Sequence, residues 1–257
     1  QKLTGLTIQF AGLITFTGVA AMSDAVGGVD VCVSKAIADP YTGTFLSAGT
    51  HTLQGLAALE FLRSRHGVGD GSDLGRIGSQ QVFLSALVRK IKSSDTLTNF
   101  SKLYAIAEAA TQHITLSQNF THLDTLVSVA LVLKNIPLEN IVFVQYPGKT
   151  GGTGIYAGKV QPVASIANQL MAAIKADQPI GLDSQALTGA HGGSTLDPNA
   201  PTATPTPTPT GKKGSTPTAT PSATPTDDLE TAPPVTVIPG LKGQSAATYT
   251  CTEGRKG

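Results

Sequence analysis

Four charged residues and a glutamine surround a glycine-rich stretch in the first third of the chain. They are Arg63, Arg65, Asp73, Arg76 and Gln80. Only 14% of the chain is charged, so this concentration stands out against the rest of the sequence. Guanidinium groups are planar and grip phosphate through two hydrogen bonds at once. The cluster therefore predicts a binding site for a phosphorylated anion; a solvated ion-pair network at a helix end is the alternative.

Two helices are needed to position these side chains. Leucines spaced by three predict a helix over residues 54–62. Arg63 and Arg65 share a side only in extended backbone, so this helix should end near Arg63. A second helix should begin at Ser72 or Asp73, either of which can cap it, and run to about residue 94. Arg76 and Gln80 then lie on one face near the helix N-terminus, where the dipole favours anions.

The fold class follows from alternating element patterns. Strand-like residues, a short helix capped by Thr17, Gly27-Gly28 and a second strand over 29–33 form one unit of an α/β domain. Further helical patterns cover 100–113 and 121–136, a strand covers 141–145, and Pro162 starts a last helix. We predict a layered α-β-α domain with a central mixed sheet flanked by helices, representing part of a domain.

The chain divides by composition into three parts. Residues 1–180 are rich in Leu, Ile, Val and Ala and form the domain. Residues 181–234 form a linker rich in Pro, Thr and Ala. The Thr-Pro and Ala-Thr-Pro repeats over 197–226 cannot bury enough apolar surface to offset the entropy of ordering, so we expect this linker to be a disordered tail that acts as an extended, semi-rigid spacer. Residues 235–257 contain two strand-like patterns that can dock onto the domain.

Composition also excludes some functions. A net charge of +1 argues against nucleic-acid binding, which needs a basic surface. No segment approaches the ~18 apolar residues of a membrane span, so we expect any membrane anchor to lie outside this chain. The two cysteines, Cys32 and Cys251, are too few for a structural zinc site. In an exported protein they can form a disulfide that ties the C-terminal segment to the domain; unpaired buried thiols are the alternative.

Three ordered blocks carry a family resemblance. The first runs from Ile14 to Val31 and ends in Gly-Gly-Val-Asp-Val, the second runs from Gly49 to Arg65, and the third from Ser72 to Gln81. Together they resemble the LytR-CpsA-Psr family of bacterial cell-envelope glycopolymer transferases, over Leu6 to about Pro179. Members of that family have a membrane helix and an extracytoplasmic α/β domain.

The resemblance implies an activity and a set of site residues. The family transfers a glycopolymer from a polyprenyl pyrophosphate carrier onto peptidoglycan, or in some relatives onto a surface protein, at the outer face of the cell membrane. Arg63 and Arg65 correspond to its pyrophosphate-binding arginines, and Asp73, Arg76 and Gln80 to residues of the same pocket. Mg²⁺ bridges the phosphates in that family. We thus assign catalysis to Arg63, Arg65, Asp73 and Arg76, and substrate binding to the three arginines with Gln80.

The sequence also departs from the family pattern. Thr15 stands where an acidic residue is common, and Gln54 where Asp or Asn is common. The family domain begins well before Gln1, and its metal-binding aspartates belong to that earlier portion. We therefore expect no metal ligands in this chain and no activity from it alone. A noncatalytic stalked envelope-binding protein and a pyrophosphatase using the same pocket are the competing functions.

Overall fold

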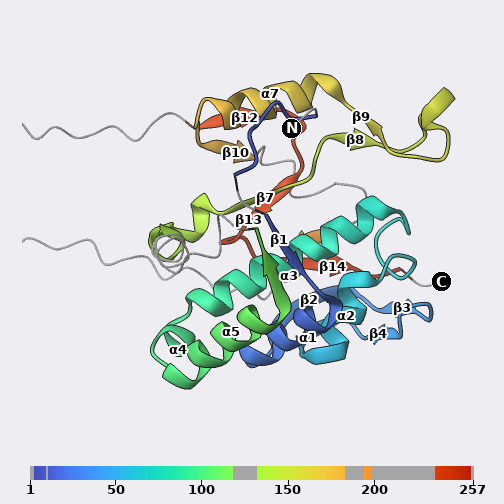
Figure 1. Cartoon of the computed structure of the whole chain (residues 1–257). Helices are drawn as coiled ribbons and strands as arrows, with labels where there is room; N and C mark the ends of the chain where they lie inside the picture. The colour runs from blue at the N-terminus through green and yellow to red at the C-terminus, as the bar shows by residue number, and fades with distance from the viewer. Residues whose placement is uncertain (1–2, 10, 118–131, 183–193, 198–234, 256–257) are drawn as a thin grey trace, which may run out of the picture.

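Helices and a mixed sheet form a larger lobe, and a smaller lobe lies to one side of it (Figure 1). The computed structural model describes residues 3–9, 11–117, 132–182, 194–197 and 235–255. This arrangement agrees with the predicted α/β class with a mixed sheet flanked by helices. Most of the predicted disordered linker over 181–234 and most of the predicted helix over 121–136 lie outside the described residues. The prediction of a disordered linker is wrong at its described residues 181–182 and 194–196, because they belong to the strands β10 (Ile180–Leu182) and β11 (Ser194–Leu196).

A four-stranded sheet forms the centre of the larger lobe. Its strands, in spatial order, are β11 (Ser194–Leu196), β14 (Thr250–Glu253), β2 (Val29–Lys35) and β5 (Gly49–Leu53). β14 runs parallel to β2, whereas β5 runs antiparallel to β2 and β11 antiparallel to β14. β14 comes from the far end of the chain, yet it lies between β11 and β2. The C-terminal segment is therefore an interior part of this sheet.

The core of the larger lobe lies on one face of β2. Alternate residues Val29, Val31 and Val33 are buried, as expected for a strand with period-two side chains. They belong to one apolar cluster with Phe61 of α2 (Gly55–Arg63) and Phe83 of α3 (Asp73–Lys92). Burying each such side chain stabilises the fold by roughly 1.5–3 kcal/mol. The two helices that carry the arginine cluster are thus fixed to the sheet by their apolar faces.

A helical layer covers the lower part of the larger lobe in Figure 1. α1 (Phe16–Ala25) packs against α2 and against α5 (Phe100–His113), which leads into β6 (Ile114–Leu116). β6 pairs antiparallel with β1 (Gly12–Ile14). The cap predicted at Thr17 is wrong, because Thr15 is the N-cap residue and its Oγ1 accepts a hydrogen bond from Gly18 N–H at 3.0 Å. The predicted stop is confirmed by left-handed φ angles of 77° and 92° at Gly27 and Gly28.

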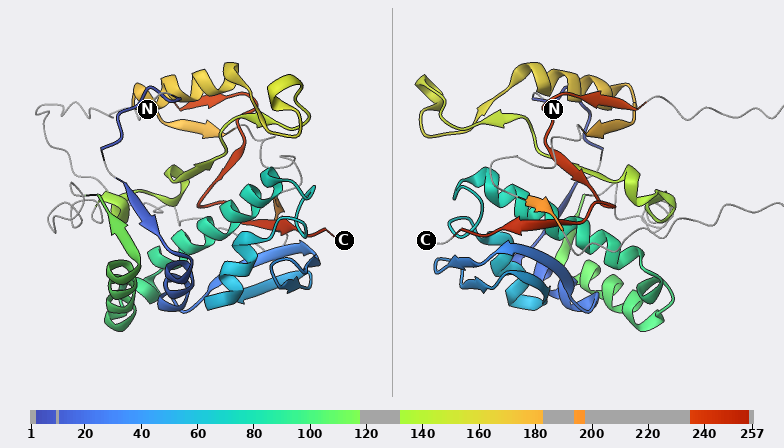
Figure 2. Two further views of the ribbon diagram at one scale, coloured as in Figure 1. Left: turned by 45° about the vertical axis from the view of Figure 1, so that its right-hand side comes forward. Right: turned by 180° about the vertical axis from the view of Figure 1, so that it is seen from behind.

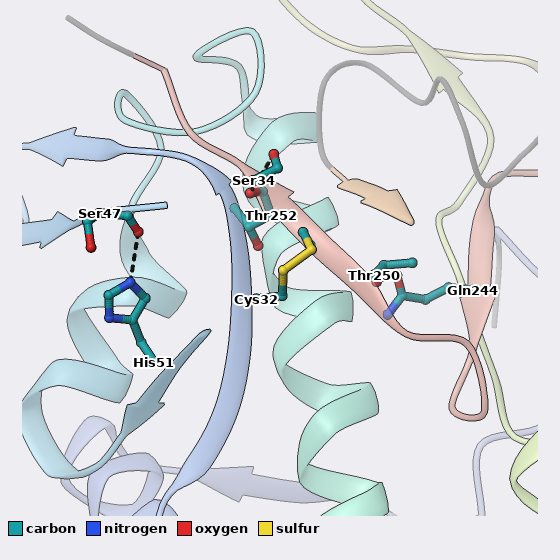
Figure 3. Close-up of a disulfide and its surroundings, with 8 residues drawn as sticks. Cys32, Ser34, Ser47, His51, Gln244, Thr250 and Thr252 are labelled. Carbon is teal, nitrogen blue, oxygen red and sulfur yellow. Dashed lines mark hydrogen bonds between the residues drawn. A yellow bond between two sulfur atoms is a disulfide. The ribbon is translucent and has the colours of Figure 1, made fainter. Parts of the chain in front are cut away.

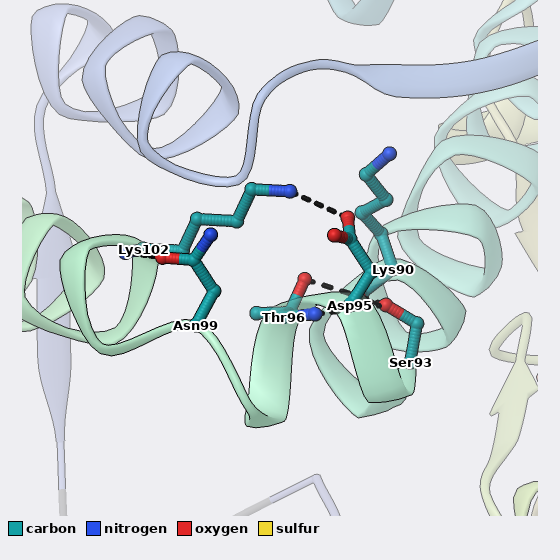
Figure 4. Close-up of polar contacts among 6 residues, drawn as sticks. All are labelled: Lys90, Ser93, Asp95, Thr96, Asn99 and Lys102. Carbon is teal, nitrogen blue, oxygen red and sulfur yellow. Dashed lines mark hydrogen bonds and ion pairs between the residues drawn. The ribbon is translucent and has the colours of Figure 1, made fainter.

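A short helix, α4 (Ser94–Leu97), joins α3 to α5 (Figure 4). Ser93 Oγ accepts a hydrogen bond from Thr96 N–H at 3.3 Å, and Asn99 Oδ1 accepts one from Lys102 N–H at 3.1 Å at the start of α5. Lys102 also pairs with Asp95, and its hydrogen bond and positive charge lower the pKa of that exposed carboxyl. These contacts fix the corner between the two helices.

A hairpin precedes β5. Its strands are β3 (Ile37–Asp39) and β4 (Thr44–Leu46), and they pair antiparallel across the predicted turn at 39–43. Gly43 closes this turn with a left-handed φ of 82°. The hairpin places Asp39 at the end of β3, facing the chain segment that follows α2.

The smaller lobe is built around one helix and short strand pairs (Figure 2). Its elements are η2 (Leu138–Asn140), β7 (Val142–Val144), β8 (Gly148–Lys149), η3 (Gly154–Tyr156), β9 (Gln161–Pro162), α7 (Ala164–Lys175), β10 (Ile180–Leu182), β12 (Thr236–Ile238) and β13 (Gly243–Ser245). β10 pairs parallel with β12, β13 antiparallel with β7, and β8 antiparallel with β9. Leu170 and Ile238 anchor a second apolar cluster. Pro162 belongs to β9 instead of starting α7.

The C-terminal segment runs through both lobes. β12 lies in the smaller lobe, β13 pairs with β7 on the side of that lobe that faces α3, and β14 enters the central sheet. A disulfide joins Cys251 of β14 to Cys32 directly opposite it on β2 (Figure 3). In the part of the chain that the structure describes, no helix is both long and apolar enough to cross a membrane. The predicted boundaries at 180 and 234 stay predictions.

Candidate anion-binding site

The first part of the site is the C-terminus of α2. The helix ends at Arg63, and Ser64 leaves it with φ −59° and ψ 128°. Arg65 therefore follows in non-helical backbone. The predicted helix stop at Arg63 is confirmed.

The second part is the first two turns of α3. Ser72 caps the helix, because its Oγ accepts hydrogen bonds from Leu74 N–H at 3.2 Å and Gly75 N–H at 3.4 Å. Asp73 Oδ1 and Arg76 Nη2 form an ion pair of 2.6 Å, with both side chains partly exposed. Gln80 donates a hydrogen bond of 3.1 Å to the carbonyl of Leu62, one residue before the end of α2. This bond holds the arginine-bearing end of α2 against the start of α3.

The loop between the two helices is held by the C-terminal segment. Gly69 and Gly71 have left-handed φ angles of 53° and 79°, which glycine adopts without strain. Gly69 N–H donates to the carbonyl of Glu253 at 2.8 Å, and Arg255 N–H donates to the carbonyl of Gly67 at 2.7 Å. The loop therefore extends the edge of the central sheet and has a defined backbone path.

A buried carboxylate holds the other side of the loop. Asp39 is 0% exposed, and its Oδ2 accepts hydrogen bonds from Ser64 Oγ and Arg65 N–H, both at 2.9 Å. The same oxygen accepts from the N–H groups of His66 at 3.0 Å and Gly67 at 3.2 Å. The sequence indicates only a turn at this position, because nothing local connects residue 39 with residues 64–67. An aspartate that ends a strand next to a turn is the one weak signal.

Among the described residues, hydrogen-bond donors and not a cationic side chain stabilise the charge of Asp39. Burial raises the pKa of its carboxyl, but the hydrogen bonds from Ser64 Oγ and from backbone N–H groups, those of Arg65, Gly67 and Tyr41, outweigh burial. The net result is a pKa below the ordinary value. Asp39 is therefore ionised at neutral pH, and it leaves the neighbouring arginine side chains to other partners.

The arginine side chains have different surroundings. The Arg63 guanidinium lies over the Phe16 ring of α1, 5.2 Å from its centroid, within the range of a cation–π contact. Arg65 is exposed on the loop. Arg76 is paired with Asp73, yet its Nε is buried and has no hydrogen-bond acceptor among the described residues. Sequence reasoning missed Phe16 as well as Asp39. The cluster offers positive charge beside a helix N-terminus, which suits an anion.

The described residues near the arginines do not form a magnesium site. Mg²⁺ needs oxygen ligands, usually one or two carboxylates together with phosphates and water. Asp39 is filled by five hydrogen-bond donors, and Asp73 is paired with Arg76. The one close group of candidate ligands in the described part of the chain is Cys32, Asp197 and Cys251, whose sulfurs are bonded to each other.

A separate cavity of about 340 Å³ lies beside the disulfide. Arg89, which lines it, donates hydrogen bonds to the carbonyls of Ala246 at 2.7 Å and Thr248 at 3.1 Å. Its guanidinium also lies 4.2 Å from the centroid of the Tyr249 ring. Burial lowers the pKa of Arg89, although Tyr249 and Asp197 oppose this. Arg89 fixes the C-terminal segment to α3. The residues that line this cavity do not include the predicted catalytic and substrate-binding residues Arg63, Arg65, Asp73, Arg76 and Gln80.

The fold and the site define an α/β protein with an arginine-rich turn between two helices. The chain belongs to the LytR_cpsA_psr family, whose model matches residues 1–173. It is 37% identical over 161 residues to the cell wall biosynthesis protein LcpA of Corynebacterium glutamicum, covering 62% of this chain and 30% of LcpA. It is 33% identical over 134 residues to the probable cell wall biosynthesis protein LcpB of the same organism, covering 52% of this chain and 32% of LcpB.

Solved structures share the fold. The LytR-Csp2A-Psr enzyme from Actinomyces oris is similar with a TM-score of 0.51 and 24% identity, over 65% of this chain and 64% of that one. TagV of B. subtilis is similar with a TM-score of 0.53 and 19% identity, over 68% and 66% of the two chains. The chain spans about a third of the length of the curated relatives that it matches.

Proposed function

We propose that the turn between α2 and α3 binds the pyrophosphate of a polyprenyl pyrophosphate-linked glycopolymer. The complete protein would transfer that glycopolymer onto peptidoglycan or a surface protein at the extracytoplasmic face of the bacterial cell membrane. The observation that carries the proposal is the hydrogen bond from Gln80 to Leu62. It holds the arginine-bearing end of α2 against the positive N-terminal end of α3. Membership of a family whose relatives act in cell wall biosynthesis supports the same function.

The transfer makes one bond and breaks one. The oxygen of an acceptor hydroxyl attacks the phosphorus that carries the sugar, and the hydroxyl proton is lost to a base or to solvent. The bond from that phosphorus to the bridging oxygen breaks, and polyprenyl phosphate leaves with the electron pair. Positioning and charge neutralisation are the main requirements of such a step. Arg63, Arg65 and Arg76 would supply both.

Asp73 has two candidate roles in this scheme, orienting Arg76 or activating the acceptor. The ion pair of 2.6 Å favours the orienting role, because the carboxylate already holds the guanidinium. We also propose that Mg²⁺ would supply additional positive charge to the pyrophosphate. Its carboxylate ligands would come from outside the described residues, and we expect this chain alone to lack turnover.

Binding of pyrophosphate to the 257-residue chain tests the proposal. Arg65→Ala should weaken binding by about 10–100-fold, because one charge-assisted contact contributes roughly 1.5–3 kcal/mol. Lys102→Ala is the control, since it removes a half-buried positive charge that is paired with Asp95 away from the loop. Isothermal titration calorimetry with and without Mg²⁺ gives the affinities. Equal affinity for wild type and Arg65→Ala would contradict the proposal.

The competing functions differ in their products. A pyrophosphatase releases phosphate from a pyrophosphate substrate without any added acceptor. A noncatalytic binding protein keeps pyrophosphate affinity and gives no product even in the complete protein with carrier lipid and acceptor. Assaying the complete protein with and without peptidoglycan therefore distinguishes all three.

A further inference from the structure

We infer that Asp39 is a positioning residue of the anion-binding turn. Its buried carboxylate sets the backbone path of residues 64–67 and, through it, the direction from which Arg65 approaches the anion. The inference rests on the proposed function for the role of Arg65, but the structural link between Asp39 and the turn stands independently of it.

The link is a convergence of donors on one oxygen. Asp39 Oδ2 accepts hydrogen bonds from the consecutive N–H groups of Arg65, His66 and Gly67, at 2.9, 3.0 and 3.2 Å. Ser64 Oγ adds a fourth bond at 2.9 Å. Successive N–H groups that point at one anion form a concave nest, which requires a specific backbone conformation. The carboxylate thus determines how the chain leaves α2.

The hairpin turn is tied to the same carboxylate. Asp39 Oδ1 accepts from Tyr41 N–H at 3.1 Å, and the rings of Tyr41 and His66 lie 4.8 Å apart. Gly67 is packed closely against Asp39, because a Cβ on Gly67 would come within 2.8 Å of Asp39 Cβ. The hairpin and the arginine turn therefore move as one unit.

The chemistry requires a carboxylate at this position. Every hydrogen-bonding group described around Asp39 is a donor, and an ionised carboxylate is acceptor-only. An asparagine would turn its NH₂ group toward at least one N–H group. Because backbone dipoles satisfy the Asp39 charge, the carboxylate does not need Arg65 as a counterion. The guanidinium of Arg65 is then left exposed for an external anion.

Amide hydrogen exchange tests the structural link. In Asp39→Asn the amides of Arg65, His66 and Gly67 should exchange about tenfold faster or more, as local opening becomes easier by roughly 1.4 kcal/mol. The amides of α7, in the smaller lobe, should keep their wild-type rates. Unchanged rates at residues 65–67 would overturn the inference. If Asp39→Asn does not fold, Ser64→Ala takes its place, because it removes one donor and keeps the carboxylate; it should accelerate the same amides.

Ligand selectivity tests the positioning role. Pyrophosphate has two phosphate groups to be held at once, so its binding depends more on a fixed direction of Arg65 than the binding of orthophosphate does. Asp39→Asn should therefore weaken pyrophosphate binding about tenfold and orthophosphate binding less, so the ratio of the two affinities falls. Thr96→Val is the matched control, because it removes a buried hydroxyl that accepts a hydrogen bond of 3.4 Å from Ser93 Oγ, in α4 and away from the turn. It should leave the ratio unchanged.

The outcomes separate the two proposals. If Arg65→Ala binds pyrophosphate as well as wild type does, the proposed function fails whatever Asp39→Asn does. If Arg65→Ala loses affinity but Asp39→Asn keeps both the affinity and the selectivity ratio, the positioning role of Asp39 is wrong. If Asp39→Asn and Thr96→Val lower the ratio equally, the effect is general destabilisation and the inference is again overturned.

Discussion

Two carboxylates near the arginines show how burial decides what a residue contributes. Asp73 pairs with Arg76 at the surface, and exposed ion pairs contribute about 0–1 kcal/mol. Asp73 therefore contributes mainly by orienting the guanidinium of Arg76. Asp39 is buried with five donors, so removing its charge leaves several N–H groups unsatisfied. Asp39 therefore holds the turn through its hydrogen bonds, although the sequence pattern gives little sign of this role.

The lowered pKa of Asp39 predicts a pH dependence of stability. In the unfolded chain the carboxyl titrates near its ordinary value of about 3.9. Since its folded pKa is lower, ionisation stabilises the fold above about pH 4, and this contribution is lost as the pH falls through the folded pKa. The wild type should therefore be more stable than Asp39→Asn at neutral pH, and this difference should shrink on acidification.

Urea unfolding at several pH values between about 2 and 7 measures this difference, and other titrating groups cancel between the two proteins. Asp95→Asn is a useful comparison, because that carboxyl also has a lowered pKa but is exposed. A difference between wild type and Asp39→Asn that does not change with pH would contradict the assignment of an ionised, hydrogen-bonded Asp39.

At the scale of elements, the site depends on where two helices end. α2 stops at Arg63 and α3 begins after Ser72, so the residues between them form a loop with defined anchors on both sides. Asp39 of β3 holds the start of this loop, and Glu253 at the end of β14 holds its middle through Gly69. The helix N-terminus and the arginines can act together only while both anchors persist.

Removing the cap of α3 should test this arrangement. Ser72→Ala should lower the free energy of unfolding by about 1 kcal/mol, because two N–H groups lose their acceptor. Pyrophosphate affinity should also fall, since the first turn of α3 carries Asp73 and lies next to the arginines. Chemical denaturation and calorimetry measure the two effects.

Ser101→Ala provides the control for the cap. It makes the same chemical change at an exposed position in the first turn of α5, where Asn99 and not Ser101 is the capping residue. This variant should be as stable as the wild type or slightly more stable. If Ser72→Ala behaves in the same way, the cap does not stabilise the start of α3.

At the scale of the whole molecule, the C-terminal segment connects parts that are far apart in sequence. It supplies β12 to the smaller lobe and β14 to the central sheet, where the disulfide joins Cys251 to Cys32. Arg89 donates a hydrogen bond to the carbonyl of Ala246 in this segment. Gly69, in the loop between α2 and α3, donates one to the carbonyl of Glu253 at the end of β14. The segment is thus part of the support of the candidate site.

Replacing both cysteines with serine should destabilise the folded chain by about 2–5 kcal/mol, as is typical when a native disulfide is removed. The bridge closes a loop with a sequence separation of 219 residues, so the reduced unfolded chain gains considerable freedom. Denaturant unfolding under oxidising conditions measures the loss. Under reducing conditions the variant and the wild type should have similar stability.

Non-reducing peptide mapping tests the bridge itself. A peptide pair joined through Cys32 and Cys251 is expected. Free thiols at both positions would show that the bridge is absent. The double serine variant would then not be expected to lose stability.

The sequence by itself determined the local elements and the family. The stop of α2 at Arg63, the start of α3 after Ser72 and the glycine turn at 27–28 were predictable, because caps, glycines and helical spacing act within a few residues. The motif blocks indicated the family that the comparison then showed. Local spacing did not identify the N-cap residue of α1, because Thr15 and Thr17 are both able to cap a helix.

Only the tertiary structure decided how these elements support one another. The hydrogen bonds from residues 64–67 to Asp39, the contact of Arg63 with Phe16 and the parallel pairing of β14 with β2 join positions that no short-range pattern connects. Each depends on burial in a shared core, which is a property of the whole chain. Spacing along the sequence can place an arginine on a turn, but the packed neighbours decide which way that turn faces.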